Sequence, residues 1–157
     1  TFRLMAQDAL ALAAPHLGQP FARSDAPLFT PASPLDPRWS PAVRQRLQAR
    51  YGSLAANLCA SANSDDLECI PGTQTLWIEL PLAARHEAVE HLDDLLLRRT
   101  RLGILLPQGA LALLERIRRL CAPHLGWSDA RWEAEIARYR ALVHTHYQLP
   151  NLEKIGL

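Results

Sequence analysis

The chain has 157 residues, of which 48% are hydrophobic, and 17 basic against 16 acidic residues leave a formal net charge of +1. This length predicts one domain that buries about two-thirds of its unfolded surface, and the balanced charge argues against a nucleic-acid partner. The apolar runs are too short to span a membrane, and three cysteines without a CxxC spacing argue against a disulfide scaffold or a zinc ribbon.

The first third of the chain predicts short helices separated by a linker. Residues 2–14 have apolar side chains at helical spacing, with Thr1 as a plausible N-cap. Residues 15–40 are expected to form a proline-rich linker, because seven of the twelve prolines lie between positions 15 and 41. A second helix is expected over residues 41–50, with a serine cap and a proline at its first position, and a short third helix over residues 53–61.

The remainder predicts an all-α domain over residues 41–150, followed by a tail at 151–157. Residues 75–80 resemble a strand but have no partner strand in the chain, so we expect an extended segment packed on helices or pairing outside the chain. Three further helices are expected over 81–103, over 107–121, and from Ser128 towards Pro150. The predicted fold class is a small helical bundle of about five to six helices with a proline-rich N-terminal linker.

The most informative segment is HLDDLLLRRTR at residues 91–101. On a continuous helix, Asp94 and Arg98 form an i,i+4 ion pair on the face opposite the leucines. Arg99 instead lies in line with Leu92, Leu95 and Leu96. A guanidinium among leucines needs a carboxylate or carbonyl partner, or must extend its head to water.

Other patterns give weaker functional hypotheses. His86 and His91 have i,i+5 spacing, whereas the zinc motif HExxH needs i,i+4, so we predict no metal site. The adjacent Asp93 and Asp94 diverge on a helix and suit surface ion pairing better than acid–base catalysis. Neither a Gly-x-Ser-x-Gly turn nor a glycine-rich dinucleotide fingerprint occurs. We therefore predict no catalytic residue, and we expect Trp77 and the later tryptophans to be core anchors.

Three segments carry a family resemblance. Residues 91–103 include Arg98, Arg99, Thr100 and Arg101, and residues 125–142 include a Leu-Gly-Trp turn followed by an Arg-Trp-Glu-x-Glu pattern. Together with residues 1–9, these segments resemble the C-terminal helical domain of FAD-dependent glycerol-3-phosphate dehydrogenases. Residues 65–80 follow the family pattern only loosely, and Pro123 interrupts a helix that is commonly unbroken.

The resemblance implies that the chain, which starts at Thr1 without a methionine, is part of a longer flavoenzyme. That parent would oxidise sn-glycerol 3-phosphate to dihydroxyacetone phosphate, with FAD bound upstream, no cofactor in this fragment, and electrons passed to the quinone pool. Residues 1–14 would be the end of a flavin-domain helix. Thr1 would then lie beside the flavin, the alternative being that it is only an N-cap.

The resemblance also implies roles for the signature residues. The cluster Arg98, Arg99, Thr100 and Arg101 would dock this domain on the upstream flavin domain, and Trp127 and Trp132 would be structural. The family places Glu133 or Glu135 opposite Arg99 as its acidic partner. The expected location is cytoplasmic, with peripheral attachment to the inner membrane through the parent. The alternative is a stand-alone helical interaction module that recruits a partner.

Overall fold

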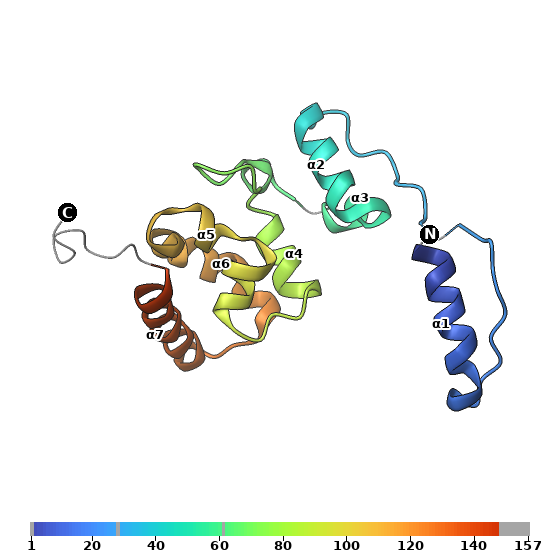
Figure 1. Cartoon of the computed structure of the whole chain (residues 1–157). Coiled ribbons are helices and arrows are strands. Elements are labelled where there is room, and N and C mark those ends of the chain that lie inside the picture. Colours follow the sequence, from blue (N-terminus) through green and yellow to red (C-terminus); the bar gives the residue numbers. More distant parts are fainter. Residues whose placement is uncertain (1, 28, 61, 148–157) are drawn as a thin grey trace, which may run out of the picture.

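The computed structural model describes residues 2–27, 29–60 and 62–147 (Figure 1). Within them the regular secondary structure is helical apart from one isolated antiparallel bridge between Cys69 and Leu76, which confirms the predicted all-α class. No helix in these ranges is long and apolar enough to cross a membrane. The principal elements are α1 (Phe2–Leu17), α2 (Pro41–Tyr51), α3 (Ala55–Leu58), α4 (Glu79–His86), the π-helical η3 (Asp94–Arg99), α5 (Leu102–Leu105), the 3₁₀ turn η4 (Pro107–Leu113), α6 (Leu114–Leu125) and α7 (Asp129–His146).

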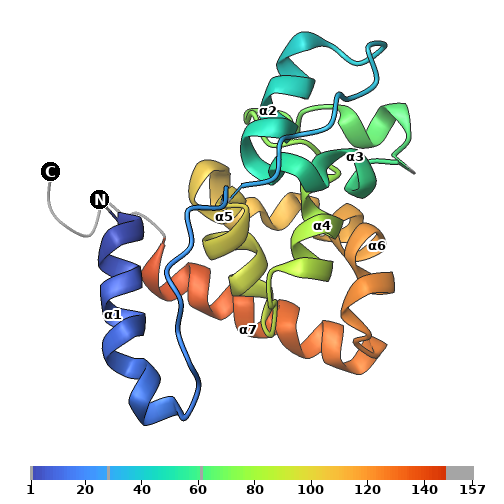
Figure 2. The same cartoon turned by 90° about the vertical axis from the view of Figure 1, so that its right-hand side faces the viewer.

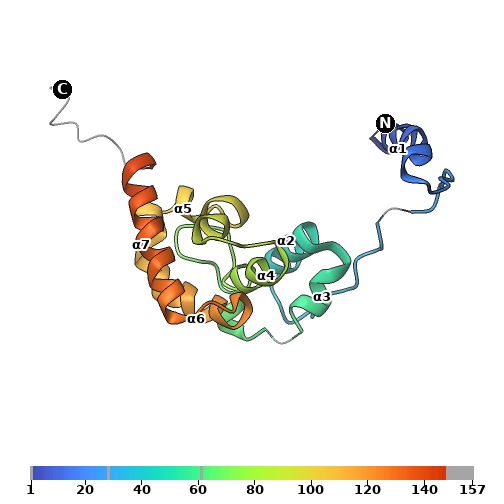
Figure 3. The ribbon, with the colours of Figure 1, turned by 90° about the horizontal axis from the view of Figure 1, so that it is seen from below.

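Helix α1 stands apart from the other helices (Figures 1 and 3). It continues to Leu17, three residues past the predicted end and with Pro15 inside it, whereas residues 18–27 and 29–40 contain no helix or strand. None of its residues is buried. The Arg3 guanidinium donates to the carbonyls of Ser24 and Ala26, so polar contacts with the returning chain hold this helix rather than apolar packing.

The rest of the chain packs around two apolar cores that share one segment. The side chains of residues 76–84 divide between the two cores: Leu76, Ile78 and Leu82 belong to the core that includes residues of α2 and α3. Trp77 and Leu80 belong to the larger core, which includes residues of η3, α6 and α7. The segment 75–80, expected to be extended, does pack on helices, but its only bridge in the described structure joins Leu76 to Cys69, and α4 already begins at Glu79.

The long helix expected over residues 81–103 is wrong, because the chain breaks twice there. Helix α4 ends at His86, and Ala88 has a φ of 49°. The chain becomes helical again at Leu92 and continues into η3. Thr100 closes the π geometry of η3, because both its backbone N–H and its hydroxyl donate to the Leu95 carbonyl, at 3.0 and 2.7 Å. Arg101 then adopts a left-handed conformation with φ 59° before α5 begins.

The helix expected over residues 107–121 also starts later than predicted. Gln108, Gly109 and Ala110 all have positive φ, so the α-helix begins only at Leu114. Close packing against α7 imposes this turn: a Cβ on Gly109 would lie 2.6 Å from Val143 Cγ2, and the Tyr139 hydroxyl donates to the Gly109 carbonyl at 2.8 Å. Helix α6 continues through Pro123 to Leu125.

The last helix begins where it was predicted, but it ends at His146 rather than near Pro150. Gly126 has a φ of 62° after α6, and the Ser128 hydroxyl accepts from the Arg131 N–H at the start of α7. Trp132, Tyr139 and Val143 form the buried face of α7, which lies along one side of the larger core beside α5 and α6 (Figure 2). This helix thus forms one wall of the domain.

Candidate functional site: an arginine-lined pocket

A pocket of about 960 Å³ lies where α2, the loop 72–75 and the segment 98–101 meet. Five guanidiniums and a single carboxylate, that of Glu87, are among the groups that line it. The arginines are Arg46 and Arg50 from α2 and Arg98, Arg99 and Arg101 from the segment 98–101. The lining therefore has an excess of positive charge, although the whole chain is almost neutral.

The buried carboxylate of Glu79 fixes the α2 side of the pocket. Its side chain is fully buried, and its oxygens lie 2.5 Å from Arg46 Nε and 3.3 Å from Arg50 Nε. It also accepts from the Leu76 N–H at 2.9 Å. A buried charge needs such partners, because an unpaired one would be strongly destabilising. Glu79 thus ties α2 to α4 and holds both arginines at the pocket wall.

Arg50 also connects the two sides of the pocket. Its Nη2 donates to the carbonyl of Arg99 at 2.8 Å and lies 3.9 Å from Glu87. The carbonyl belongs to the last residue of η3, where backbone oxygens lack helical partners. Arg50 therefore caps the segment 98–101 while its own charge is compensated by Glu79 and Glu87.

Two of the four signature residues have internal partners. Arg98 contacts Asp93 at 2.5 Å and Asp94 at 2.9 Å, which confirms the predicted Asp94–Arg98 pair. Thr100 is buried and uses its hydroxyl to close the π turn onto Leu95. Arg98 and Thr100 therefore stabilise the backbone on which Arg99 and Arg101 are carried.

Arg99 and Arg101 differ from those two residues. Arg99 Nε is buried and has no hydrogen-bond partner among the described residues. The expected pairing of Arg99 with Glu133 or Glu135 is wrong, because Glu133 pairs with Arg118 and the Glu135 carboxylate is bound by other groups. Both Arg99 and Arg101 line the pocket instead.

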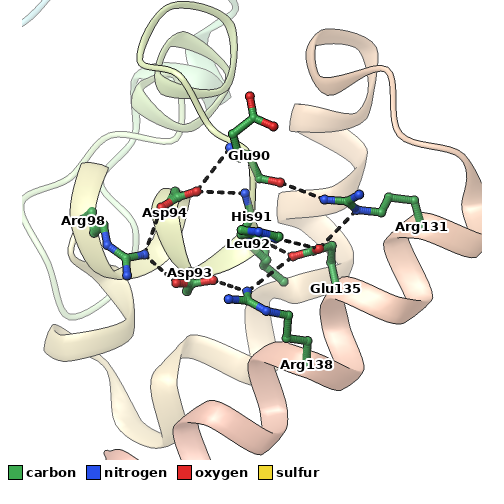
Figure 4. Close-up of polar contacts among 9 residues, drawn as sticks. All are labelled: Glu90, His91, Leu92, Asp93, Asp94, Arg98, Arg131, Glu135 and Arg138. Carbon is green, nitrogen blue, oxygen red and sulfur yellow. Dashed lines mark hydrogen bonds and ion pairs between the residues drawn. The ribbon is translucent and has the colours of Figure 1, made fainter.

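The carboxylates of Glu135 and Asp93 form the centre of a second polar network, between η3 and α7 (Figure 4). Glu135 accepts from the Leu92 N–H at 3.0 Å and lies 2.9 Å from His91 Nδ1 and 3.1 Å from Arg131 Nε. Asp93 lies between Arg98 and Arg138. The network binds backbone and side chains of the helix break to α7.

The charge states of this network indicate a structural role. Burial raises the pKa of Asp93, but hydrogen bonds from Arg98 and Arg138 outweigh it and hold the pKa below its ordinary value. Burial acts likewise on Glu135, whose pKa is lowered overall by His91 and the Leu92 N–H. Both carboxylates are therefore ionised at neutral pH, which suits fixed anchors rather than proton donors.

The other candidate residues follow the structural interpretation. Trp132 is buried and Trp127 packs on it with ring centroids 4.8 Å apart, as core anchors do. Burial raises the pKa of Cys59 to about 11 and of Cys121 to about 12, so both are thiols rather than nucleophilic thiolates at neutral pH. Thr1 lies outside the described residues.

The described part of the chain has no cluster of side chains suited to bind a metal ion. Within residues 2–27, 29–60 and 62–147, no three His, Cys, Asp or Glu side chains are placed to hold one metal ion. His91, one member of the near-HExxH pattern, instead contacts Glu135.

Sequence reasoning missed the α2 half of the pocket. Arg46 and Arg50 are four residues apart and therefore share one helical face, which is a detectable signal for paired basic groups. Glu79 is a single acid inside the apolar run LWIELPL, and an acid in such a run implies a buried partner. No local pattern connects these residues to the segment 98–101, because folding alone brings them together.

Comparison with known proteins places these residues in a family context. Residues 6–132 match the family described as the C-terminal domain of alpha-glycerophosphate oxidase. The chain is 36% identical over 102 residues to glycerol-3-phosphate dehydrogenase 2 of Mycobacterium tuberculosis, a match that covers 63% of this chain and 17% of the relative. No solved structure matches it.

Two further relatives carry the same description. Identity is 34% over 104 residues to the glycerol-3-phosphate dehydrogenase of Mycobacterium leprae, covering 63% of this chain and 17% of that protein. It is 26% over 114 residues to a mitochondrial glycerol-3-phosphate dehydrogenase of Arabidopsis thaliana, covering 71% and 18%. The chain thus spans less than a fifth of the length of the curated relatives that it matches.

Proposed function

Because this chain belongs to the family of the C-terminal domain of alpha-glycerophosphate oxidase, we propose that it is the accessory domain of an FAD-dependent glycerol-3-phosphate dehydrogenase. The parent oxidises sn-glycerol 3-phosphate to dihydroxyacetone phosphate and passes electrons to quinone, at the cytoplasmic side of a membrane. The supporting observation is the match over residues 6–132, together with relatives named as glycerol-3-phosphate dehydrogenases whose sequence lies mostly outside the matched part.

The flavin belongs to an upstream domain in this proposal. Dinucleotide cofactors bind at the carboxyl edge of a parallel sheet whose first turn is glycine-rich. The described residues of this chain are helical with one isolated bridge, and the sequence has no such glycine pattern. These residues therefore do not fit FAD, and the redox step takes place in the upstream domain. The proposed contact of Thr1 with the flavin would arise only at the junction between the domains.

Docking on the upstream domain is the proposed role of this chain. Phe2, Met5 and Leu12 share one face of α1 and are 69%, 67% and 77% exposed, so this apolar face has no cover within the described chain. The proposed occupant is the upstream flavin domain, which in the relatives supplies most of the length. The segment 98–101, with the exposed Arg101 at its end, is the second proposed contact with that domain.

A binding experiment in two parts tests the docking proposal. The upstream region of the gene and this chain are expressed separately, mixed, and followed by sedimentation velocity and by glycerol-3-phosphate oxidation with a dye acceptor. Met5→Ser and Leu12→Ser are expected to weaken the complex at least about tenfold, because the apolar face loses buried area. Phe29→Ser, 80% exposed but outside α1, is the matched control and should leave affinity unchanged.

The outcomes separate this proposal from the stand-alone interaction module. A native polypeptide with the mass of this chain alone, 17.5 kDa, would contradict the accessory-domain role. A complex that the α1 variants and the Phe29 control weaken equally would leave the role intact but exclude the apolar face of α1 as the docking surface.

A further inference from the structure

The charges around the arginine-lined pocket do not balance. Arg46 and Arg50 are compensated by Glu79 and Glu87, as Arg98 is by Asp93 and Asp94. Asp93 is also shared with Arg138. In the described structure no ion pair compensates Arg99 or Arg101, and both line the pocket. The pocket therefore has two uncompensated positive charges, those of Arg99 and Arg101.

Arg99 has a specific unmet requirement. Its Nε is buried without a hydrogen-bond acceptor in the described structure, and leaving a buried donor unpaired costs about 1–3 kcal/mol, more for a charged group. Leu96 and the rest of the leucine face supply no acceptor, and Glu133 and Glu135 are engaged elsewhere. The buried Nε cannot be reached by an entering ligand, but the two terminal nitrogens of this guanidinium are not buried and have no partner in the described structure, so an acceptor for them can come from the pocket.

The backbone on either side of Arg99 is held in place by other contacts. Thr100 is buried and bonded to Leu95, the Arg99 carbonyl is bonded by Arg50, and Arg101 stands in a left-handed conformation. A non-glycine residue in that conformation costs energy and persists only where its surroundings impose it. Arg99 and Arg101 are thus presented to one cavity by a rigid frame, which reduces the entropy lost when a ligand binds.

We propose that this pocket binds the dianionic group of a phosphate monoester through the guanidiniums of Arg99 and Arg101. A phosphate monoester carries up to two negative charges and three acceptor oxygens, which matches two uncompensated guanidiniums better than a single carboxylate does. The cavity, about 960 Å³, also has room for the remainder of a small polar ester. The proposal concerns this chain alone and goes beyond docking.

Nuclear magnetic resonance of the ¹⁵N-labelled chain tests the proposal directly. Inorganic phosphate and sn-glycerol 3-phosphate are titrated at about pH 8, above the second pKa of about 6 of a phosphate monoester, with acetate at equal ionic strength as the control. The Nε–Hε resonance of Arg99 is expected to move in a saturable way with both phosphates and not with acetate. A shift that follows ionic strength alone would overturn the proposal.

Variants locate the site. Arg99→Met and Arg101→Met are each expected to weaken phosphate binding at least about tenfold, measured on the Thr100 amide resonance, whereas Arg99→Lys should weaken it less because the charge remains. Arg119→Met and Arg140→Met are the controls, since both arginines are exposed and neither lines the pocket. Equal weakening by the controls would contradict a site at Arg99 and Arg101.

A vesicle arm separates the two sources of such a phosphate. Sedimentation with phosphatidylcholine vesicles that contain phosphatidic acid, itself a phosphate monoester, is compared with sedimentation with pure phosphatidylcholine vesicles. Binding of free esters without co-sedimentation assigns the pocket to a small molecule, and co-sedimentation that Arg99→Met abolishes assigns it to a lipid headgroup. Absence of both contradicts the proposal, while docking on the flavin domain is measured separately and can hold in either case.

Discussion

Replacing Glu79 by glutamine should destabilise the protein substantially, although the two side chains have the same shape. Glu79 is fully buried and compensates both Arg46 and Arg50. The glutamine amide keeps one acceptor but removes the charge and directs an NH₂ group at a donor. Removing one partner of a buried pair costs about 3–5 kcal/mol. The lower end, about 3 kcal/mol, is expected here because the two arginines are 29% and 34% exposed and can regain water.

Thermal unfolding followed by circular dichroism measures this cost. For a domain of this size about 1 kcal/mol corresponds to about 2–4 °C, so Glu79→Gln should lower Tm by about 6–12 °C. Glu87→Gln is the matched control, because Glu87 is 30% exposed and lies 3.9 Å from Arg50, and it should cost less than about 1 kcal/mol. Equal effects of the two substitutions would refute the argument that burial makes the Glu79 pair important.

The reciprocal experiment separates charge compensation from packing. In a triple variant, Glu79→Leu is combined with Arg46→Met and Arg50→Met. Replacing a whole buried ion cluster by apolar residues is often neutral or stabilising, so the triple variant should recover most of the stability lost in Glu79→Gln. A triple variant as unstable as the single one would show that the polar contacts themselves, including the one to the Leu76 N–H, carry the stability.

Three further predictions concern the rest of the fold. Gly103→Ala should lower the free energy of unfolding by about 1–3 kcal/mol, because its Cβ would lie 2.2 Å from the Tyr139 hydroxyl. Gly126→Ala has open space around its Cβ but a φ of 62°, and should lower it by only about 1 kcal/mol. Urea unfolding of both variants distinguishes overpacking from backbone strain. Because the pKa of Asp93 is lower in the folded than in the unfolded protein, its contribution to stability is present above the unfolded pKa of about 4 and is lost as pH falls through the lower folded value. Asp93→Asn should therefore reduce the loss of unfolding free energy on acidification. An unchanged dependence of the unfolding free energy on pH would contradict this. Amide hydrogens of α1 should exchange much faster than those of α7, because α1 buries no residue; equal protection by mass spectrometry would show that α1 packs on the bundle.

Local rules in the sequence determined the elements whose causes are local. Ser40 and Ser128 cap α2 and α7 as predicted, Gly126 takes the left-handed position after α6, and the i,i+4 spacing gave the Asp94–Arg98 pair. Each of these depends on groups within four residues along the chain, so the pattern contains the whole cause. The family resemblance also rests on such contiguous segments, and the match over residues 6–132 confirms it.

The tertiary structure supplied one of the two acceptors that decide where the expected long helix breaks, the other being the nearby Asp94. The N–H groups of Glu90 and His91 bond to Asp94 Oδ2, and that of Leu92 bonds to Glu135, 43 residues away. Two carboxylates thus replace the preceding carbonyls as acceptors, and the chain no longer needs helical geometry at 87–91. A helical projection of the sequence cannot contain an acceptor supplied by another helix.

The same physical reason explains Arg99. Its position among leucines correctly indicated a guanidinium with an unmet need, but Glu135 was already engaged with His91 and the Leu92 N–H. The direction in which Arg99 points was set by the π turn and by α2, whose Arg50 bonds the Arg99 carbonyl. Composition and spacing fix which charges the chain has, whereas only packing decides which of them find partners and which remain to face a cavity.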